Sequence, residues 1–404
     1  MAARRAIRRF PLLLALLATA LWAGLARAET IDVSAPHAIL IDYDTGSVLF
    51  EKGADEPVTP ASTVKIMTVE VVFDEIEAGR VKLDDQFTVS EHAWRTGGAP
   101  SRSSSMFAAL NSHVRVEDLI RGAVIVSGND AAIALAEGVA GSEQAFVALM
   151  NKRAAELGLK RSTFANAWGM EDPGQKVTAR DMAALAIHLI AAYPNYYKYF
   201  SEKDFTWGKI RQTNRNPLLT MEIGADGLKT GNIDASGFGL VGSAVQNGQR
   251  LVVAIYGAPN AKERAEEARK LLLWGFRSFT PKRIFATGET VGAAKVFGGA
   301  SFEAPLVAKG AVTILTPRVG GEKISGRIVY QGPLAAPVEA GKEVARLKLY
   351  RGGVEILDAP LVTAAAVPVG SLPQQALGAG VEYVGGLLRK YLGSKLSGKY
   401  VAKE

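Results

Sequence analysis

The sequence predicts an α/β (α+β) fold for the first two thirds of the chain, followed by a small all-β domain. Short apolar runs typical of strands occur near residues 37–50 and again at 228–256. Between them, apolar residues recur with a helical period. Beyond residue 281 this period is lost, and short alternating runs rich in Val, Ala and Gly replace it. A chain of 404 residues, 48% hydrophobic and 22% charged, is long enough to bury the cores of two or three domains.

The first domain is expected to begin with a β-hairpin and a helix. The hairpin is predicted at residues 37–50, because two apolar runs flank an Asp-Thr-Gly turn at 44–46. The helix is predicted at 63–79, with Pro60 before its start and Gly79 after its end. Further helices are predicted at 116–140 (interrupted at 127–129), 143–158, 180–192 and 261–276, and further strands at 228–231, 238–245 and 251–256.

The second domain is assigned to residues 282–368, after a first domain at 29–281. Alternating runs at 311–315, 324–330 and 343–350 have the period of strands. No helical period is present in this region, so we expect a small β-sandwich.

Residues 1–28 have the pattern of a secretory signal peptide. Four arginines precede an uncharged run at 10–26, and Ala26-Arg27-Ala28 is a small-x-small cleavage site. A transmembrane anchor is the alternative, but the run is slightly short for a span and contains Pro11 and Gly24. We therefore expect cleavage at this site and export of the chain.

The charge and the residue types exclude several classes of function. The formal net charge falls from +7 to +2 when residues 1–28, with five arginines and no acid, are left out, so no nucleic acid is expected as a partner. The sequence has no cysteine, which excludes a thiol nucleophile and a thiolate metal site. Its four histidines form neither an HExxH motif nor a close pair, and no GxSxG or GxxxxGK[ST] sequence occurs. We expect no metal and no cofactor.

Ser62-Thr63-Val64-Lys65 is the first of three short motifs that could carry chemistry. In a helix, residues i and i+3 share a face, so the Ser62 hydroxyl and the Lys65 amine can meet. A serine at a helix N-terminus also lies near free backbone N–H groups that can hold an oxyanion. A lysine in a dry cleft near other cations can lose its proton near neutral pH and act as a base. Alone the motif is weak, because S-x-x-K is expected by chance about once in a chain of this length.

Two further motifs follow along the chain. Ser127-Gly128-Asn129 interrupts the predicted helices and offers a hydroxyl and a carboxamide for proton relay and for holding a peptide amide. These are also ordinary turn residues. Lys229-Thr230-Gly231 lies on a predicted strand, where an amine and a hydroxyl suit a substrate carboxylate and the glycine permits close approach. A surface lysine on an edge strand is the plainer interpretation.

The set S-x-x-K, S-x-N and K-T-G, in this order, is typical of penicillin-binding proteins and class A β-lactamases. The chain resembles the low-molecular-mass penicillin-binding proteins, the serine-type D-alanyl-D-alanine carboxypeptidases of peptidase family S11. The segments that carry the resemblance are TPASTVKIMT (59–68), LIRGAVIVSGNDAA (119–132), TARDMA (178–183), IRQTNRNPLL (210–219), GLKTG (227–231) and EEARKLLLWGFR (266–277). The resemblance implies a transpeptidase/β-lactamase-like catalytic domain, with an antiparallel sheet flanked by helices.

The resemblance also implies a role for each matched residue. Ser62 would attack the penultimate D-alanine and form an acyl-enzyme, with Lys65 as its base. Ser127, coupled to Lys229, would pass a proton to the leaving D-alanine, while Asn129 would position the substrate amide. Gly231 would let the substrate backbone approach closely. The backbone N–H groups of Asn232 and Ser62 would form the oxyanion hole. Thr230 and Arg264 would bind the terminal carboxylate.

The implied partners are peptidoglycan stem peptides, shortened from pentapeptide to tetrapeptide, and β-lactam antibiotics as covalent inhibitors. A serine β-lactamase is one alternative. It is disfavoured because no Glu-x-x-Leu-Asn segment lies between Ser127 and Lys229. A non-catalytic envelope-binding protein that kept the fold is another. Asn232-Ile233 leaves this alternative open. The family often has an aromatic residue or histidine at the first of these positions and threonine at the second, so a hydroxyl that could help to bind a carboxylate is missing at Ile233.

Residues 369–404 predict a membrane-associating tail. From residue 372 onward the chain has five cations and two acids. A cationic amphipathic helix lies in the membrane interface, whereas Arg389 and Lys390 interrupt any apolar span. A helix packed on the β domain is the alternative. The enzyme is therefore expected to be periplasmic, on the outer face of the cytoplasmic membrane. Leu377, Val381, Val384, Leu388 and Leu392 form the predicted apolar face.

Overall fold

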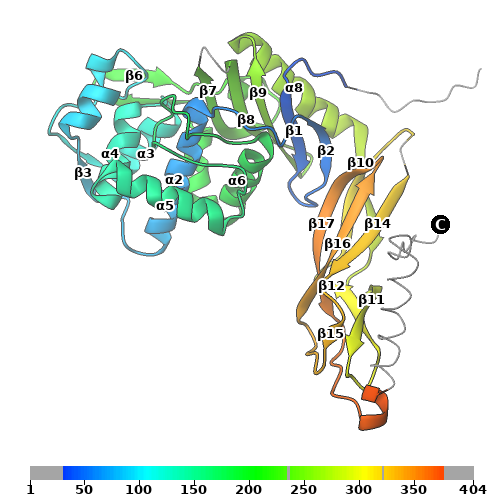
Figure 1. Cartoon of the computed structure of the whole chain (residues 1–404). Coiled ribbons are helices and arrows are strands. Elements are labelled where there is room, and N and C mark those ends of the chain that lie inside the picture. Colours follow the sequence, from blue (N-terminus) through cyan, green and yellow to red (C-terminus); the bar gives the residue numbers. More distant parts are fainter. Residues whose placement is uncertain (1–30, 234–236, 321–322, 377–404) are drawn as a thin grey trace, which may run out of the picture.

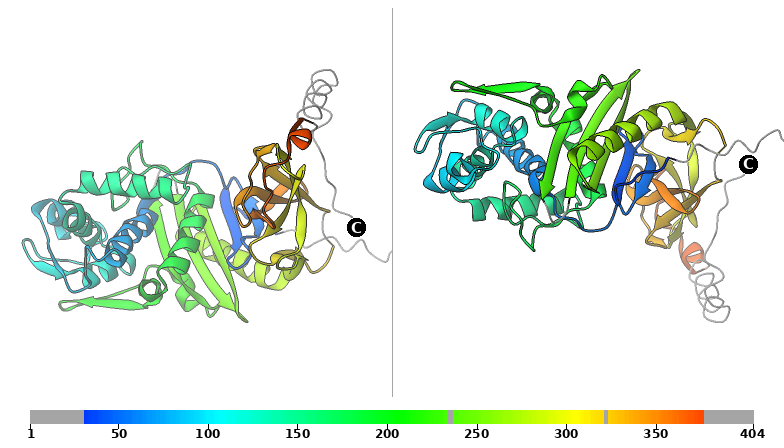
Figure 2. Two further views of the ribbon diagram at one scale, coloured as in Figure 1. Left: turned by 90° about the horizontal axis from the view of Figure 1, so that it is seen from below. Right: turned by 90° about the horizontal axis from the view of Figure 1, so that it is seen from above.

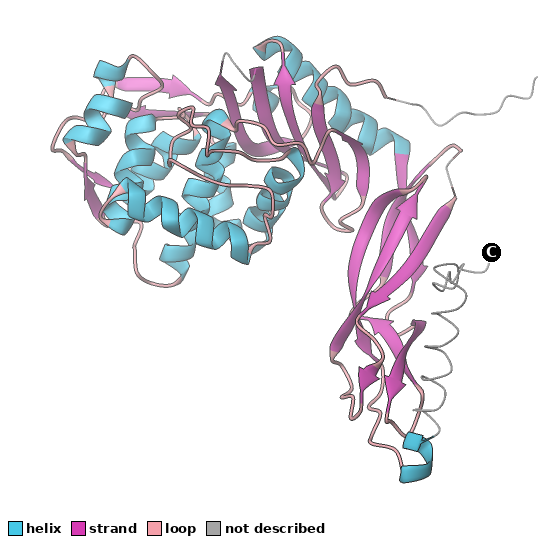
Figure 3. Ribbon diagram, in the orientation of Figure 1, coloured by secondary structure: helices cyan, strands magenta, loops and turns pink. Residues whose placement is uncertain are grey.

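The computed structural model describes residues 31–233, 237–320 and 323–376, which form a helix-rich domain and an elongated β domain (Figures 1 and 3). The predicted signal peptide and the apolar face of the predicted tail lie outside the described residues. Within the described part, no single helix is long and apolar enough to cross a membrane. Two consecutive helices at 129–140 and 143–156 pass that test only as a pair bent by 84°.

A five-stranded antiparallel sheet forms the centre of the first domain, with the strand order β2-β1-β9-β8-β7. The hairpin predicted at 37–50 is confirmed as β1 and β2. The strands predicted between 228 and 256 are also confirmed. The bounds are β1 His37–Asp42, β2 Val48–Lys52, β7 Ala225–Ile233, β8 Gly237–Gln246 and β9 Gln249–Ala258.

The central strand β9 is buried on both faces, because helices cover the sheet on either side (Figure 2). Leu251, Val253 and Ile255 belong to the core beneath the long C-terminal helix α8 of this domain. Val252 and Ala254, which alternate with them, belong to the larger core beneath the other helices. This period of two on a strand apolar throughout is typical of a sheet covered on both faces.

The predicted helices are confirmed, with one difference at the first. Ser62 lies in a 3-10 turn, η1 (Ala61–Val64), and the α-helix begins only at Lys65. Ala61 has a left-handed backbone (φ 49°), so regular helical geometry cannot start before it. The helices are α2 Lys65–Glu77, α3 Val116–Val124, α4 Asn129–Ala140, α5 Glu143–Glu156, α6 Ala179–Ala192, α7 Pro194–Tyr197 and α8 Ala261–Ser278.

Two small two-stranded sheets beside the helices were not predicted. Their strands have three or four residues, too few for a periodic signal. They are β3 Gln86–Thr88 with β4 His113–Arg115, and β5 Asp204–Trp207 with β6 Ile210–Thr213.

The second domain is all-β, as predicted. A two-stranded sheet, β10-β13, packs on a six-stranded sheet of order β14-β16-β17-β12-β11-β15. Val312 and Ile314 of the small sheet share one core with Leu347 and Leu349 of the large one. The bounds are β10 Phe279–Phe285, β11 Thr290–Phe297, β12 Glu303–Ala308, β13 Val312–Pro317, β14 Ile324–Tyr330, β15 Leu334–Ala335, β16 Glu343–Arg351 and β17 Val354–Thr363.

The two domains join without an intervening loop. Helix α8 ends at Ser278 and strand β10 begins at Phe279, so the boundary expected between 281 and 282 falls inside this strand. Two hydrogen bonds span the junction: the backbone N–H of Leu315 donates to Ser47 Oγ (3.2 Å), and that of Arg318 donates to the Ser278 carbonyl (2.8 Å).

Candidate active site

The first motif places a hydroxyl beside an amine, as the spacing predicts. Lys65 Nζ lies 3.2 Å from Ser62 Oγ, across one turn at the start of α2. Ser62 is half-buried, so its hydroxyl can reach both the amine and a ligand. Lys65 is completely buried.

Lys65 Nζ has three hydrogen-bonding neighbours, and its burial favours the neutral amine. Its Nζ donates to Asn129 Oδ1 (2.7 Å) and to the Trp168 carbonyl (2.5 Å). A neutral amine has two N–H groups and one lone pair, so these two acceptors leave the lone pair for the Ser62 hydroxyl. Burial, and after it the positive charge of Lys229, holds the pKa of Lys65 well below its ordinary value.

Ser127 and Lys229 form a second hydroxyl–amine pair facing the first. Ser127 lies in the turn between α3 and α4, with a left-handed backbone (φ 63°). Lys229 Nζ donates to Ser127 Oγ (2.9 Å) and to the Thr230 carbonyl (2.9 Å). Burial, followed by the charges of Arg264 and Arg215, lowers the pKa of Lys229 to about 7. This lysine can therefore give up or take a proton near neutral pH.

The side chain of Asn129 contacts the first pair. Its Oδ1 accepts from Lys65, and its Nδ2 donates to Ser103 Oγ (2.9 Å). A carboxamide has two N–H donors, so one remains for a peptide carbonyl. The adjacent Asp130 is fully buried and accepts from Ser105 Oγ (2.7 Å) and from the backbone of Met106, Ala108 and Ala131.

Two glycines let the chain close around Ser62. A Cβ at Gly231 on β7 would lie 3.0 Å from the backbone N of Ser62, so the K-T-G strand passes directly beside the turn that carries Ser62. A Cβ at Gly169, whose φ is +99°, would lie 2.4 Å from the Ala61 carbonyl carbon. Only glycine fits at either position without displacing backbone.

The remaining predicted residues lie on β7 and α8. Thr230 is buried and Asn232 is exposed. Arg264 is only 7% exposed, with its guanidinium 5.7 Å from the centre of the Phe238 ring. Its Nε has no hydrogen-bond partner among the described residues. Burial lowers the pKa of Arg264 to about 10, so it remains a cation at neutral pH.

Sequence reasoning missed two contributors to this constellation. Trp168 acts through its backbone carbonyl, which no residue-type motif can reveal. Asp130 does leave a signal, because it is the single acid in the apolar stretch 122–136, directly after the S-x-N motif. Among the described residues, no group of three or more His, Asp or Glu side chains is arranged to hold a metal ion.

This arrangement, serine hydroxyls beside buried lysine amines at the edge of an antiparallel sheet, is typical of a class of protein: the serine acyl-transfer enzymes. Residues 25–260 match the family model described as D-alanyl-D-alanine carboxypeptidase (peptidase S11), and residues 279–369 match that of the penicillin-binding protein 5 C-terminal domain. The chain therefore belongs to the D-alanyl-D-alanine carboxypeptidase family. It is a serine-type D-alanyl-D-alanine carboxypeptidase that acts on peptidoglycan.

Similar proteins cover both domains. The chain is 41% identical to the D-alanyl-D-alanine carboxypeptidase DacC of Escherichia coli, over 83% of this chain and 84% of that protein. It is similar to the crystal structure of penicillin-binding protein 5 from Haemophilus influenzae (TM-score 0.71, 36% identity, 84% and 99% coverage). Over 61% of its length, the chain is also similar to the ampicillin-bound form of penicillin-binding protein D2 from Listeria monocytogenes, of which 99% is covered (TM-score 0.54, 27% identity).

Proposed function

We propose that Ser62 is the nucleophile of a two-step acyl transfer on pentapeptide stems. As Ser62 Oγ bonds to the carbonyl carbon of the penultimate D-alanine, its proton passes to the neutral Lys65 amine. The peptide C–N bond then breaks, and the terminal D-alanine leaves with a proton. Water hydrolyses the ester and releases the tetrapeptide. The observation that carries this proposal is the 3.2 Å contact between Ser62 Oγ and Lys65 Nζ. When the amine is neutral, its two N–H groups can donate to Asn129 and Trp168, and its lone pair faces the Ser62 hydroxyl.

Ser127 and Lys229 are proposed to supply the proton for the leaving group. The hydroxyl can hand its proton to the departing amine and take another from Lys229, 2.9 Å away. A lysine pKa of about 7 suits this exchange, because neither protonation state is strongly disfavoured near neutral pH.

Two parts of the site are proposed to bind negative charge on the substrate: one binds the oxyanion that forms during the reaction, and the other binds the terminal carboxylate. The backbone N–H groups of Ser62 and Asn232 would hold the oxyanion, on the two chain segments that Gly231 brings together. Thr230 and Arg264 would bind the terminal carboxylate. A buried guanidinium with an unpartnered Nε is stabilised when an anion arrives, which supports this role.

Covalent binding of β-lactams by the same serine is part of the proposal. The acylation machinery needs only a reactive carbonyl next to Ser62, and the similar protein from Listeria monocytogenes has a solved ampicillin-bound form. A poor deacylation of the penicilloyl ester would make the drug an inhibitor rather than a substrate.

The activity is tested by incubating the purified mature enzyme with pentapeptide muropeptides. One D-alanine should be released for each tetrapeptide formed. Rapid turnover of penicillin without any release of D-alanine would instead support the β-lactamase alternative.

Arg264→Ala is expected to slow cleavage of peptides that end in a free carboxylate by about 10- to 100-fold, because a charge-assisted hydrogen bond is lost. The melting temperature should stay the same or rise slightly, since the change removes a desolvated and incompletely bonded cation. Steady-state kinetics and thermal unfolding measure the two effects. Arg269→Ala, on the exposed face of the same helix, is the matched control. An equal loss on substrates with an amidated C-terminus would contradict the role.

We also propose that the exported enzyme is periplasmic and is held on the cytoplasmic membrane by its C-terminal tail. The support is the cationic amphipathic pattern of the sequence. Removal of residues 377–404 is expected to release a folded enzyme that still binds penicillin, because every described contact of the β domain is kept. Fractionation followed by penicillin labelling measures this. A truncated protein that stays with the membrane would rule out the tail as the anchor.

A further inference from the structure

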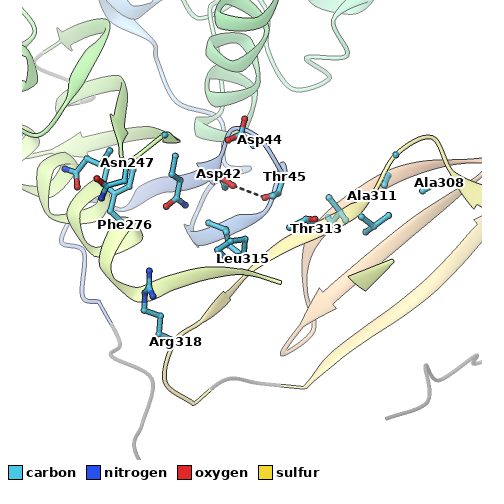
Figure 4. Close-up of a pocket in the computed structure, with 18 of the residues that line it drawn as sticks. Asp42, Asp44, Thr45, Asn247, Phe276, Ala308, Ala311, Thr313, Leu315 and Arg318 are labelled. Atoms are coloured by element: carbon cyan, nitrogen blue, oxygen red, sulfur yellow. Dashed lines mark hydrogen bonds between the residues drawn. The ribbon is translucent and has the colours of Figure 1, made fainter. Parts of the chain in front are cut away.

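The two ends of the β domain differ in charge. At the end next to the first domain, a cleft of about 900 Å³ is lined by charged side chains that include Asp42, Asp44 and Arg318 (Figure 4). At the opposite end, three segments (296–302, 331–338 and 364–376) together form the distal tip of the domain (Figure 1). None of the residues in these three segments is charged.

Backbone contacts hold the three segments of the distal tip together. Strand β15 pairs with the end of β11, and Gly299 in the turn after β11 pairs with Val369. In the same turn, the backbone N–H of Ala300 donates to the Pro368 carbonyl (2.9 Å). Because the tip has this pairing and a small core of its own, replacing one of its exposed side chains is not expected to unfold it. The buried members of this core are Val296, Ala304, Val338 and Val367.

Apolar side chains gather on the outside of the distal tip. Of the eleven large apolar side chains that are exposed among the described residues, four lie in the tip. They are Phe297 and Phe302 (44% exposed each), Val369 (54%) and Leu372 (81%). Single exposed apolar residues are ordinary, whereas a group of them in segments without charge indicates a surface that contacts another apolar phase.

Charged side chains begin again at the edges of the distal tip. Lys295 lies two residues before Phe297, and Glu303, its cross-strand neighbour, directly follows Phe302. Glu339 directly follows the second segment. All three charged residues are exposed. Burying a charge in hydrocarbon is costly, so these residues limit the tip to the interfacial region of a bilayer.

The chain leaves the described structure at the distal tip. Residues 372–376 are helical, and Gln374 Nε2 donates to the Ala300 carbonyl (3.3 Å), which attaches this helical turn to the turn after β11. The sequence that follows, 377–404, belongs to the cationic amphipathic tail proposed above to bind the membrane. A bilayer that binds this tail therefore lies beside the tip. The first domain is at the other end of the β domain and does not obstruct such a contact (Figure 1).

We propose that the distal tip is a second membrane-contact surface of this enzyme. Phe297, Phe302 and Leu372 enter the interface of the outer leaflet of the cytoplasmic membrane, next to the cationic tail. A bilayer suits the tip better than a protein partner, because protein interfaces surround their apolar centre with a polar rim and the tip has no charged group to contribute. The proposal rests on the proposed placement of the enzyme on the membrane, and not on the roles given to Ser62 or Lys65.

Co-sedimentation of the full mature chain with vesicles of phosphatidylethanolamine and phosphatidylglycerol in equal amounts tests the surface. Replacing both aromatic residues together (Phe297→Ser with Phe302→Ser) is expected to weaken binding by about tenfold or more, because their apolar surface no longer leaves water. Leu372→Ser, at a side chain that is largely exposed, should weaken binding several-fold. Ile210→Ser with Val354→Ser, at two exposed apolar side chains outside the tip, is the matched control and should bind normally.

The possible results separate the tip from the tail. Each variant should release D-alanine from a soluble pentapeptide at the wild-type rate, which shows that it is folded. Unchanged vesicle binding in both tip variants, together with loss of binding on removal of residues 377–404, would overturn the tip contact and leave the tail as the anchor. A wild-type chain that binds no vesicles would refute the membrane placement itself, and the tip contact with it.

A fluorescent label distinguishes the bilayer from the chain's own tail as the occupant of the tip. The sequence has no cysteine, so Ala300→Cys, at an exposed position, gives a single site for a polarity-sensitive nitrobenzoxadiazole dye. Its emission should shift to shorter wavelength when vesicles are added. The same dye at Ser325→Cys, exposed on β14, should not respond. A dye at position 300 that is already in an apolar environment without vesicles, and does not respond to them, would show that the tail covers the tip and would refute the proposal.

Discussion

Ser62→Ala is expected to abolish acylation, so that a fluorescent penicillin no longer labels the protein and release of D-alanine falls by at least about 10⁴-fold. The variant removes the only hydroxyl that the described structure places beside the Lys65 amine. Ser127, the other motif serine of the site, is hydrogen-bonded to Lys229 instead, and the sequence has no cysteine that could act as an alternative nucleophile. Gel labelling and a D-alanine assay measure the two losses.

Ser104→Ala is the matched control for this variant. Ser104 is exposed, and its backbone carbonyl accepts from the Asn129 N–H, a bond that an alanine keeps. Its replacement should leave labelling intact. A covalent band that survives in Ser62→Ala would assign the acylated residue elsewhere.

Lys65→Arg is expected to lose nearly all acylation at every pH, although the positive charge is kept. A guanidinium stays protonated and has no lone pair to take the Ser62 proton. The wild-type enzyme should lose acylation only as the pH falls through the lowered pKa of Lys65, because the amine is then protonated. Pre-steady-state acylation by penicillin across pH measures both profiles.

Lys65 is fully buried, so its replacement could also disturb folding. Two further variants distinguish loss of the base from loss of the folded structure. Lys65→Met keeps the length of the side chain without a charge and should be equally inactive but folded. Lys176→Arg, at a lysine whose amine contacts Thr59 Oγ1 at 3.3 Å, should acylate normally. Acylation by folded Lys65→Arg within about tenfold of the wild type would show that another group is the base.

The parts of this molecule that local pattern determines could be predicted. The hairpin at 37–50 follows from two apolar runs around an Asp-Thr-Gly turn, and the meeting of Ser62 with Lys65 follows from helical spacing. That the three motifs share one site came from their resemblance to a known family. No local rule connects residues 62, 127 and 229.

The parts set by distant packing could not be predicted. Trp168 supplies a backbone carbonyl to Lys65 from 103 residues away, and its presence there depends on the close approach of Gly169 to Ala61. The late start of α2 depends on the left-handed backbone of Ala61, which an alanine gives no reason to expect. The start of the β domain at Phe279 could not be predicted, because helix α8 continues to Ser278 and no loop separates it from the first strand.

The left-handed conformations of Ala61 and Ser127 limit which substitutions can be accepted at these two positions during evolution. Each costs of order 1–3 kcal/mol and sits next to a hydroxyl used in the proposed chemistry. At position 61, glycine would relieve the local cost, whereas valine or isoleucine would meet a severe clash. Mutations that stabilise the fold are therefore available at the active site itself, and they would loosen the turn that aims Ser62. Selection for catalysis and selection for stability pull in opposite directions at this residue.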